Sequence, residues 1–279
     1  MVATSPPEAP FNLGAFLISD GPANFLLSWT AGFVDTAAFI SLFGLFTAHV
    51  TGNIALAGSS FVSSDEGSTI TRLLMIPAFM ITVACTSLLA RFARSKGWPV
   101  FAVLLTAEAI ALTIFLVVGS FLSYSLLLDV QEDLILPIGL TGVIAMAIQN
   151  ALMKEAKGVF KSYIPTTVMT GNTTQLTIDL VELGLGKLFP GSGVSPQDVE
   201  AALERIGRIL PTIVGFGLGG FAAAYFVLLS EEFRSLIFPL IVVIVLAIAA
   251  YTQHKPEPAT SPPPVSEPVV TNLFNNSEP

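Results

Sequence analysis

The chain has 279 residues, of which 53% are hydrophobic and only 11% are charged, whereas soluble domains carry about 25% charged residues. Several apolar stretches of about 20 residues predict an all-α, polytopic membrane protein, with the lipid bilayer as its main partner. The formal net charge of −8 and the lack of a basic cluster argue against nucleic acid as a partner. The single cysteine, Cys85, excludes a disulfide framework or a cysteine-rich metal site.

The first half of the predicted membrane region covers residues 25–133. Residues 1–24 precede it; they are rich in proline, lack a basic segment, and are expected to form a disordered tail rather than a signal peptide. Apolar segments that predict transmembrane helices follow at residues 25–46, 73–92 and 98–122.

The second half, residues 134–252, repeats this layout. Its predicted transmembrane helices cover residues 134–153, 209–229 and 236–251, and a polar amphipathic stretch occupies residues 186–208. Residues 253–279 are rich in proline and serine and are expected to be a second disordered tail.

The same tripeptide, Thr-Gly-Asn, occurs once in each half inside apolar sequence. It is formed by Thr51, Gly52 and Asn53, and again 119 residues later by Thr170, Gly171 and Asn172. A helix breaker between two hydrogen-bonding side chains is costly in a membrane unless it lines a cavity or is enclosed by protein. Paired elements of this kind mark the central binding site of many transporters. A helix that begins at either motif would also direct its N–H groups toward a solute, which favours an anion. The alternative is a close helix crossing, with glycine at the contact.

The charge distribution bears on whether the two motif elements, residues 47–62 and 164–183, cross the membrane. If both are re-entrant, six helices span, both termini are cytoplasmic, and ten of the 12 lysines and arginines lie inside. If both cross, the better orientation places seven lysines and arginines inside and five outside. We therefore favour six spans plus two re-entrant elements, which makes the two halves inverted repeats. Eight spans, with parallel repeats, is the alternative.

Three ionisable residues are candidates for binding a proton or a cation. Asp35 and Glu108 lie inside predicted spans that contain no lysine or arginine, so that each would take up a proton or hold a cation. His49, which precedes the first motif, titrates near neutral pH. The alternative for all three is a hydrogen-bonded structural role. The amides Gln149 and Asn150 occupy the place of Asp35 in the second half.

Signatures of an enzyme are missing from the sequence. It shows neither a metal-ligand spacing nor a Gly-x-Ser-x-Gly turn nor a phosphate-binding loop, so we expect no catalytic residues, no metal and no cofactor.

Long motifs in both halves resemble one family. Residues 31–35 read Ala-Gly-Phe-Val-Asp, and residues 43–53 read Phe-Gly-Leu-Phe-Thr-Ala-His-Val-Thr-Gly-Asn. In the second half, residues 145–150 read Ala-Met-Ala-Ile-Gln-Asn, followed by Pro-Thr-Thr at residues 165–167 and Thr-Gly at residues 170–171. Together they are similar to the YoaK-like family, bacterial inner-membrane proteins that carry a domain of unknown function. Asn172 departs from that family, which has a small or hydroxyl residue there.

The resemblance implies a multi-pass protein of the bacterial inner membrane with about six spans, and it supplies no substrate. From the residues we expect a secondary transporter or channel for a small polar or anionic solute, coupled to protons. The two motifs, Gln149 and Asn150 would line the solute site. The alternative is a non-transporting sensor or assembly partner in which the motifs pack helices. Whether a second copy of the chain is also a partner stays open.

Overall fold

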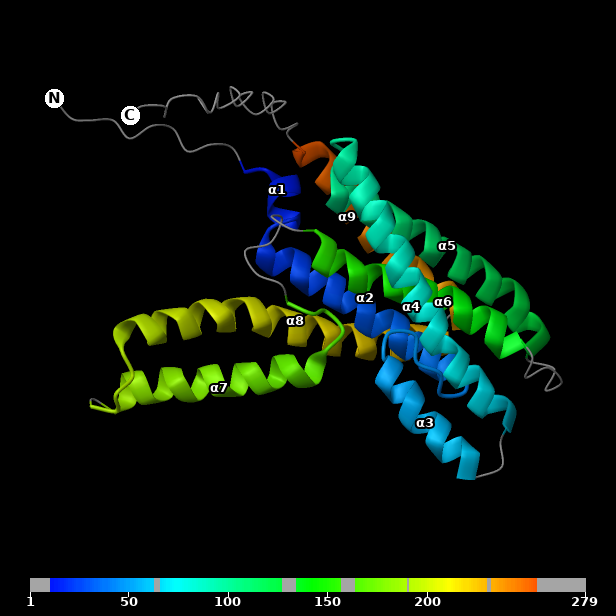
Figure 1. Cartoon of the computed structure of the whole chain (residues 1–279), viewed down its shortest axis with the longest axis horizontal. Helices are drawn as coiled ribbons and strands as arrows, with labels where there is room; N and C mark the ends of the chain where they lie inside the picture. The colour runs from blue at the N-terminus through cyan, green and yellow to red at the C-terminus, as the bar shows by residue number, and fades with distance from the viewer. Residues whose placement is uncertain are drawn as a thin grey trace, which may run out of the picture.

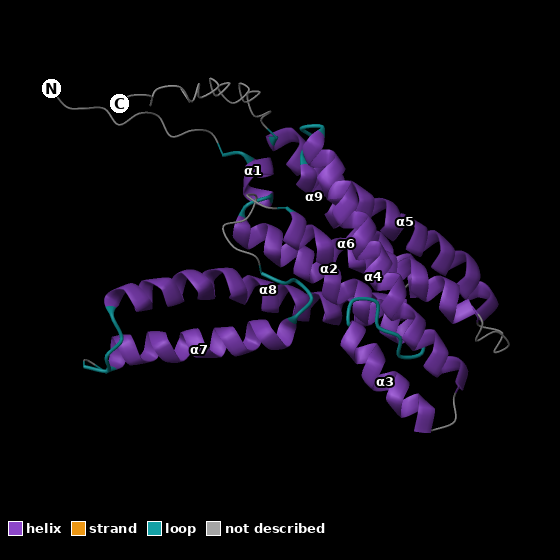
Figure 2. Ribbon diagram, in the orientation of Figure 1, coloured by secondary structure: helices purple, strands orange, loops and turns teal. Residues whose placement is uncertain are grey.

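The computed structural model describes residues 11–62, 66–126, 134–156, 164–189, 191–229 and 232–254. These residues fold into helices joined by short loops, and no strand occurs among them (Figures 1 and 2). In chain order the helices are α1 (Leu13–Leu17), α2 (Asp20–Ser41), α3 (Val50–Val62), α4 (Glu66–Ser95), α5 (Val100–Leu126), α6 (Ile135–Glu155), α7 (Met169–Leu188), α8 (Pro196–Leu229), the 3-10 helix η2 (Glu232–Leu236) and α9 (Ile237–Gln253).

Five segments of the described helices are long and apolar enough to cross a membrane. They are Thr69–Ser95, Val100–Leu122, Ile135–Glu155, Pro196–Leu229 and Phe233–Gln253. They confirm the prediction of an all-α, multi-pass membrane protein. α3 has 13 residues and so is about 20 Å long, which is shorter than the hydrocarbon core of a bilayer, about 30 Å.

α2 is long enough to span but is not among these five, because polar residues interrupt its sequence. Asn24, Ser28, Thr30 and Asp35 are all buried in it. α2 packs against α8, α6, α9 and η2, so that protein rather than lipid surrounds most of its length. α2, which corresponds to the predicted span at residues 25–46, is therefore enclosed mainly by protein.

The two halves of the chain interleave. α2, the first helix of the first half, packs against α8 of the second half, and α6, the first helix of the second half, packs against α4 of the first. Each motif-bearing helix packs mainly on the helix that follows it, α3 on α4 and α7 on α8. In Figure 1, α7 and the first part of α8 lie side by side and extend away from the other helices, while the rest of α8 packs on α2. The halves thus share one pattern of contacts and build one bundle.

Glycines permit the close approach of α2 and α8. A Cβ atom on Gly32 would clash with the carbonyl of Phe216, and one on Gly219 would clash with the carbonyl of Trp29. A Cβ atom on Gly215 would likewise clash with the carbonyl of Phe25. Small residues at such crossings let two membrane helices bring their backbones into contact.

The two ends of the bundle meet through a pair of amides. The Asn12 side chain donates to Oε1 of Gln253 at 3.1 Å, and Nε2 of Gln253 donates to Oδ1 of Asn12 at 3.2 Å. α1 packs on α9, and α1 and the start of α2 fall within residues 11–24, which the sequence assigned to the N-terminal tail. The rest of that tail and residues 255–279 lie outside the described residues. Asn12 and Gln253, near the two ends of the described helices, thus lie side by side.

Candidate functional site

Both Thr-Gly-Asn motifs occupy the first turn of a helix. α3 begins at Val50 and α7 at Met169, each one residue ahead of its motif. The loop before α3 turns sharply at Phe43 and Gly44, which have positive φ angles of 51° and 82°. The sequence analysis considered a helix that begins at each motif, and in the structure the helices begin one residue before the threonine.

The asparagine of each motif holds the loop that leads into its helix. Nδ2 of Asn53 donates to the Phe46 carbonyl at 2.7 Å, and the Phe46 N–H donates back to Oδ1 at 3.0 Å. Nδ2 of Asn172 likewise donates to the Pro165 carbonyl at 2.7 Å, again seven residues upstream. Proline has no N–H to return, so the second clamp lacks the reciprocal bond.

Asp35 anchors the loop of the first half, residues 42–49. Its carboxylate is buried and accepts from the N–H groups of Thr47 and Ala48, both at 2.7 Å, and from the Thr47 hydroxyl at 3.2 Å. Its other oxygen lies 2.5 Å from Nδ1 of His49, whose side chain is 30% exposed. The carboxylate is therefore fully satisfied, and the histidine is the member of the pair that solvent can reach.

In the second half, amide side chains hold the corresponding loop, residues 164–168. The Thr167 hydroxyl donates to Oδ1 of Asn150 at 2.6 Å. Nε2 of Gln149 lies 3.1 Å from the Thr166 hydroxyl oxygen and 2.6 Å from the Leu27 carbonyl. The sequence paired Gln149 and Asn150 with Asp35, and the structure places all three against the loop ahead of a motif.

The loops of the two halves meet beside α2 and α8. The His49 ring contacts the Thr167 backbone carbonyl and packs edge-on against Phe216 of α8. The Ser28 hydroxyl lies 3.0 Å from the Thr166 carbonyl and 2.6 Å from that of Thr212. We call the set formed by Ser28, Asp35, His49, Gln149, Thr166 and Thr167 the inter-loop cluster. It draws on both halves.

Buried polar atoms without partners lie on the helices that build this cluster. The amide nitrogen and oxygen of Asn24, one turn ahead of Ser28, have no hydrogen-bond partner among the described residues, and neither does Oε1 of Gln149. Asn24 is 1% exposed and Gln149 is fully buried. An unmade hydrogen bond in such a place is costly.

The glycines of the motifs do not touch a neighbouring helix. A Cβ on Gly52 would meet the ring of Phe46, in the loop just before α3, at 2.7 Å, and one on Gly171 would have only Cγ1 of Val168 within reach, at 3.7 Å. The close glycine crossing that was the alternative for these motifs is instead made by α2 and α8.

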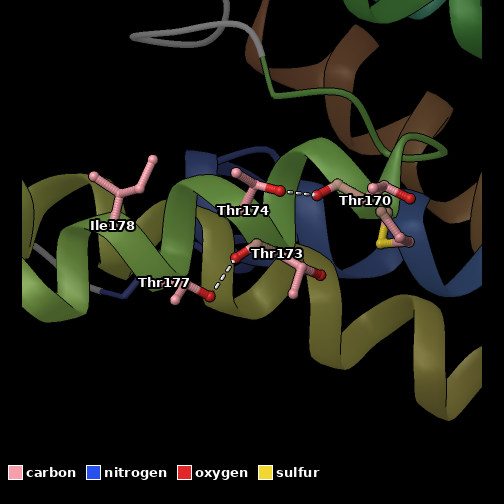
Figure 3. A pocket seen from close by; sticks show the side chains of 6 residues that line it. Thr170, Thr173, Thr174, Thr177 and Ile178 are labelled. Atoms are coloured by element: carbon pink, nitrogen blue, oxygen red, sulfur yellow. Dashed lines mark hydrogen bonds between the residues drawn. The ribbon is translucent and has the colours of Figure 1, made fainter.

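A hollow of about 580 Å³ opens along the outer face of α7 and begins at the second motif. It is lined by Met169, Thr170, Thr173, Thr174, Thr177 and Ile178 (Figure 3). The hydroxyls of Thr174 and Thr177 donate to carbonyls one turn earlier, at 2.9 and 2.8 Å. Their oxygens remain able to accept, so this face of α7 is more polar than a lipid-facing helix requires.

Glu108 lies elsewhere, on α5. It is fully buried, and neither carboxyl oxygen has a hydrogen-bond partner among the described residues. α5 packs on α4, α6, α9 and η2, so Glu108 is not part of the inter-loop cluster. Within the described residues, no three histidine, cysteine, aspartate or glutamate side chains are grouped closely enough to hold a metal ion.

Each motif helix is also tied to the next helix by an arginine, and the sequence did not reveal these bonds. Arg72 of α4 donates to the Ser60 hydroxyl at 2.5 Å, and Arg205 of α8 pairs with Asp179 at 2.8 Å. Ser60 and Asp179 both lie seven residues after the motif asparagine. Asp179 is fully buried.

Asn24 and three members of the inter-loop cluster, Ser28, Thr166 and Thr167, were not singled out as site residues in the sequence. Asn24, Ser28 and Asp35 share one face of α2, because they are spaced by four and seven residues. That polar stripe in an apolar helix was the available signal. Thr166 and Thr167 carried no comparable signal, since their partners lie on other helices.

The fold and these sites define a polytopic α-helical membrane protein built from two matching halves. The chain matches the family described as "Protein of unknown function (DUF1275)" over residues 23–249 and belongs to that family. It is 30% identical over 164 residues to the UPF0700 transmembrane protein YoaK of Bacillus subtilis (strain 168), covering 59% of this chain and 67% of that protein. No solved structure matches the chain.

Proposed function

We propose that the protein is a secondary transporter or channel of the bacterial inner membrane for a small polar or anionic solute, coupled to protons. The observation that carries this proposal is the inter-loop cluster. It joins the loops ahead of both motifs and contains a buried carboxylate paired with a half-buried histidine 2.5 Å away.

Three features support a solute at this place. The motif helices direct the N–H groups of their first turns toward the loops, which favours a group with negative charge. Asn24 and Gln149 have amide atoms free to bind a polar group. The hollow along α7 begins at the second motif. His49 can exchange a proton near neutral pH, while Asp35 stabilises its charged form.

The halves are proposed to be inverted repeats, with both termini in the cytoplasm. In such an arrangement α3 and α7 enter from opposite faces, and the loops that precede them meet near the midplane. The short length of α3 and the contact between Asn12 and Gln253 support this topology.

Transport can be tested in proteoliposomes that contain the full chain and a trapped pH-sensitive dye. A panel of small organic acids, amino acids and neutral polar solutes is added with and without a pH gradient. We expect one class of solute to move protons with it, and we expect His49→Gln to uncouple the proton from the solute. If no solute in the panel moves protons in the wild type, while a reference transporter in the same vesicles does, the proposal is wrong.

A second candidate function, a non-transporting sensor or assembly partner, is favoured by a different observation. The side chains of Asn53 and Asn172 are engaged by their own loops, as expected of structural residues. In that case Asn53→Ala lowers the thermal stability without changing any solute-dependent signal. In the transport case, the same variant also alters the flux.

A further inference from the structure

Glu108 lies in the middle of the buried face of α5. Residues three, four and seven positions to either side of it share this face. They are all apolar and at most 5% exposed: Phe101, Leu104, Leu105, Ala111, Leu112 and Phe115. The carboxyl group is about 12 Å along the helix axis from Val100, the first residue of α5. It therefore lies well inside the apolar part of the span.

The hydroxyls nearest to it in sequence do not serve as partners. Thr106 donates to the Ala102 carbonyl and Thr113 to the Ala109 carbonyl, both at 2.8 Å. Charged residues on the helices packed against α5 lie toward the ends of those helices, and the described ones are Arg72, Arg91, Arg94, Lys154, Glu155 and Arg234. Arg94 is bonded to Glu155. Within the described residues, α9 adds no charge, and Cys85 of α4 is exposed.

The chain offers two other buried carboxyl groups for comparison. Asp35 is 2% exposed and accepts hydrogen bonds from backbone N–H groups and a hydroxyl beside its contact with His49. Asp179 is fully buried and paired with Arg205. Both of these carboxyl groups have hydrogen-bond donors beside them, whereas Glu108 has none among the described residues, and an isolated charge in an apolar environment is strongly disfavoured.

We propose that Glu108 is a neutral carboxylic acid within the membrane that exchanges its proton with solvent, and therefore a specific site for modification by a hydrophobic carbodiimide. Its use as a second coupling site, beside the inter-loop cluster, rests on the proposed function. The protonation of Glu108 and its modification by the carbodiimide do not rest on the proposed function.

The modification reaction requires the protonated acid. The proton of Glu108 moves to one nitrogen of the carbodiimide, and a carboxyl oxygen bonds to the central carbon to form an O-acylisourea. The acyl group then shifts from that oxygen to nitrogen and leaves a stable N-acylurea. No group departs, and no oxidant or reductant is needed. A carboxylate held by donors has no proton to give in the first step.

The test uses the full chain in membranes, treated either with dicyclohexylcarbodiimide or with a water-soluble carbodiimide, across a range of pH. Peptide mass spectrometry then measures the labelled fraction at Glu108, Asp35 and Asp179 in the same sample. We expect the hydrophobic reagent to label Glu108 at least about tenfold more than the other two, since the cost of an unpaired charge there exceeds one factor of ten. We also expect the water-soluble reagent to leave Glu108 unlabelled.

Exchange with solvent is tested by the dependence of the label on pH. If Glu108 exchanges its proton, its labelling decreases as the bulk pH rises. Labelling that is the same at every pH means a sealed structural acid and overturns the exchange. If Glu108 is labelled no more than Asp35 and Asp179, the proposal that it is protonated is wrong. If the water-soluble reagent labels it equally well, the proposal that it lies in an apolar environment closed to water is wrong.

Glu108→Gln is the matched control, because it preserves the shape of the side chain and removes the acid. It should abolish the label at this position while the protein keeps its elution volume and melting temperature. In vesicles that show solute-driven proton flux, Glu108→Gln should reduce the protons moved per solute, and an unchanged ratio overturns the coupling role. In vesicles without such flux, the proposed function fails, and the labelling still decides the state of Glu108.

Discussion

In the first half, a buried carboxylate anchors the loop that leads into the motif helix. Asp35 binds two backbone N–H groups, a hydroxyl and His49. In the second half, Gln149 and Asn150 anchor the corresponding loop through threonine hydroxyls. Neutral amides are therefore sufficient to hold such a loop. The fold does not require the charge of the Asp35 carboxylate for this purpose. Under the proposed function, the proton-binding pair of the inter-loop cluster, Asp35 and His49, therefore belongs to the first half.

The largest expected difference between the halves concerns these anchors. Asp35→Ala leaves two N–H groups and His49 without their acceptor and should lower the free energy of unfolding by about 3–5 kcal/mol. Asn150→Ala removes the acceptor of one hydroxyl and should cost about 1–2 kcal/mol. Thermal unfolding in detergent measures both. Equal losses would show that the carboxylate is no more important to the fold than the amide.

The arginine bonds give the next comparison. Arg205→Met leaves Asp179 buried without its cation and should cost about 2–3 kcal/mol, less than for a fully buried pair because Arg205 is partly exposed. Arg72→Met loses the hydrogen bonds that the guanidinium donates to the Ser60 hydroxyl and the Phe43 carbonyl but leaves neither acceptor charged, and should cost about 1 kcal/mol.

Asp179→Ser places in the second half the residue that the first half has at the same position. Combined with Arg205→Met, it should recover most of the lost stability, since no buried charge remains. A double-mutant cycle on thermal unfolding measures the coupling. Additive losses would mean that Asp179 does not depend on Arg205.

The asparagine clamps should differ by a smaller amount. Asn53→Ala breaks two reciprocal bonds with the backbone of Phe46 and should cost about 2 kcal/mol, whereas Asn172→Ala breaks one bond to Pro165 and should cost about 1 kcal/mol. Chemical denaturation in mixed micelles can resolve the two. A larger loss at Asn172 would contradict the asymmetry that the proline imposes.

The motif glycines should show the smallest effects, with opposite signs. Gly52→Ala places a methyl group against the Phe46 ring and should destabilise the protein by about 1 kcal/mol. Gly171→Ala makes only an ordinary contact, with Cγ1 of Val168 at 3.7 Å, and should stabilise α7 by about 0.5 kcal/mol, because alanine favours a helix. The shift in melting temperature gives the sign in each case. Destabilisation by both would indicate that α7 has a partner at Gly171.

Much of the fold follows from the sequence, because lipid-facing helices are apolar over a length that the bilayer sets. The helix starts at the two motifs were also predictable, since glycine between threonine and asparagine is a local signal. α2 is different: Asn24, Ser28 and Asp35 lower its hydropathy, and only its enclosure by other helices makes them tolerable.

The partners within the site were not predictable in the same way. Ser28 and Gln149 bind backbone carbonyls on other segments, and every residue has such a carbonyl, so no sequence pattern marks the acceptor. The pairing of Asp179 with Arg205 depends on the packing of α7 against α8. From the sequence, a carboxylate shortly after an apolar stretch looks like one at the membrane surface.

The amide pair between Asn12 and Gln253 makes the helical part of the chain nearly a closed ring. Ends that lie together are a condition under which circular permutation is tolerated. A chain that begins at α6 and runs through α9, a short linker, α1 and on to α5 would keep every contact between helices while reversing the order of the halves. The contacts between the described helices therefore do not depend on the order in which the two halves occur in the chain.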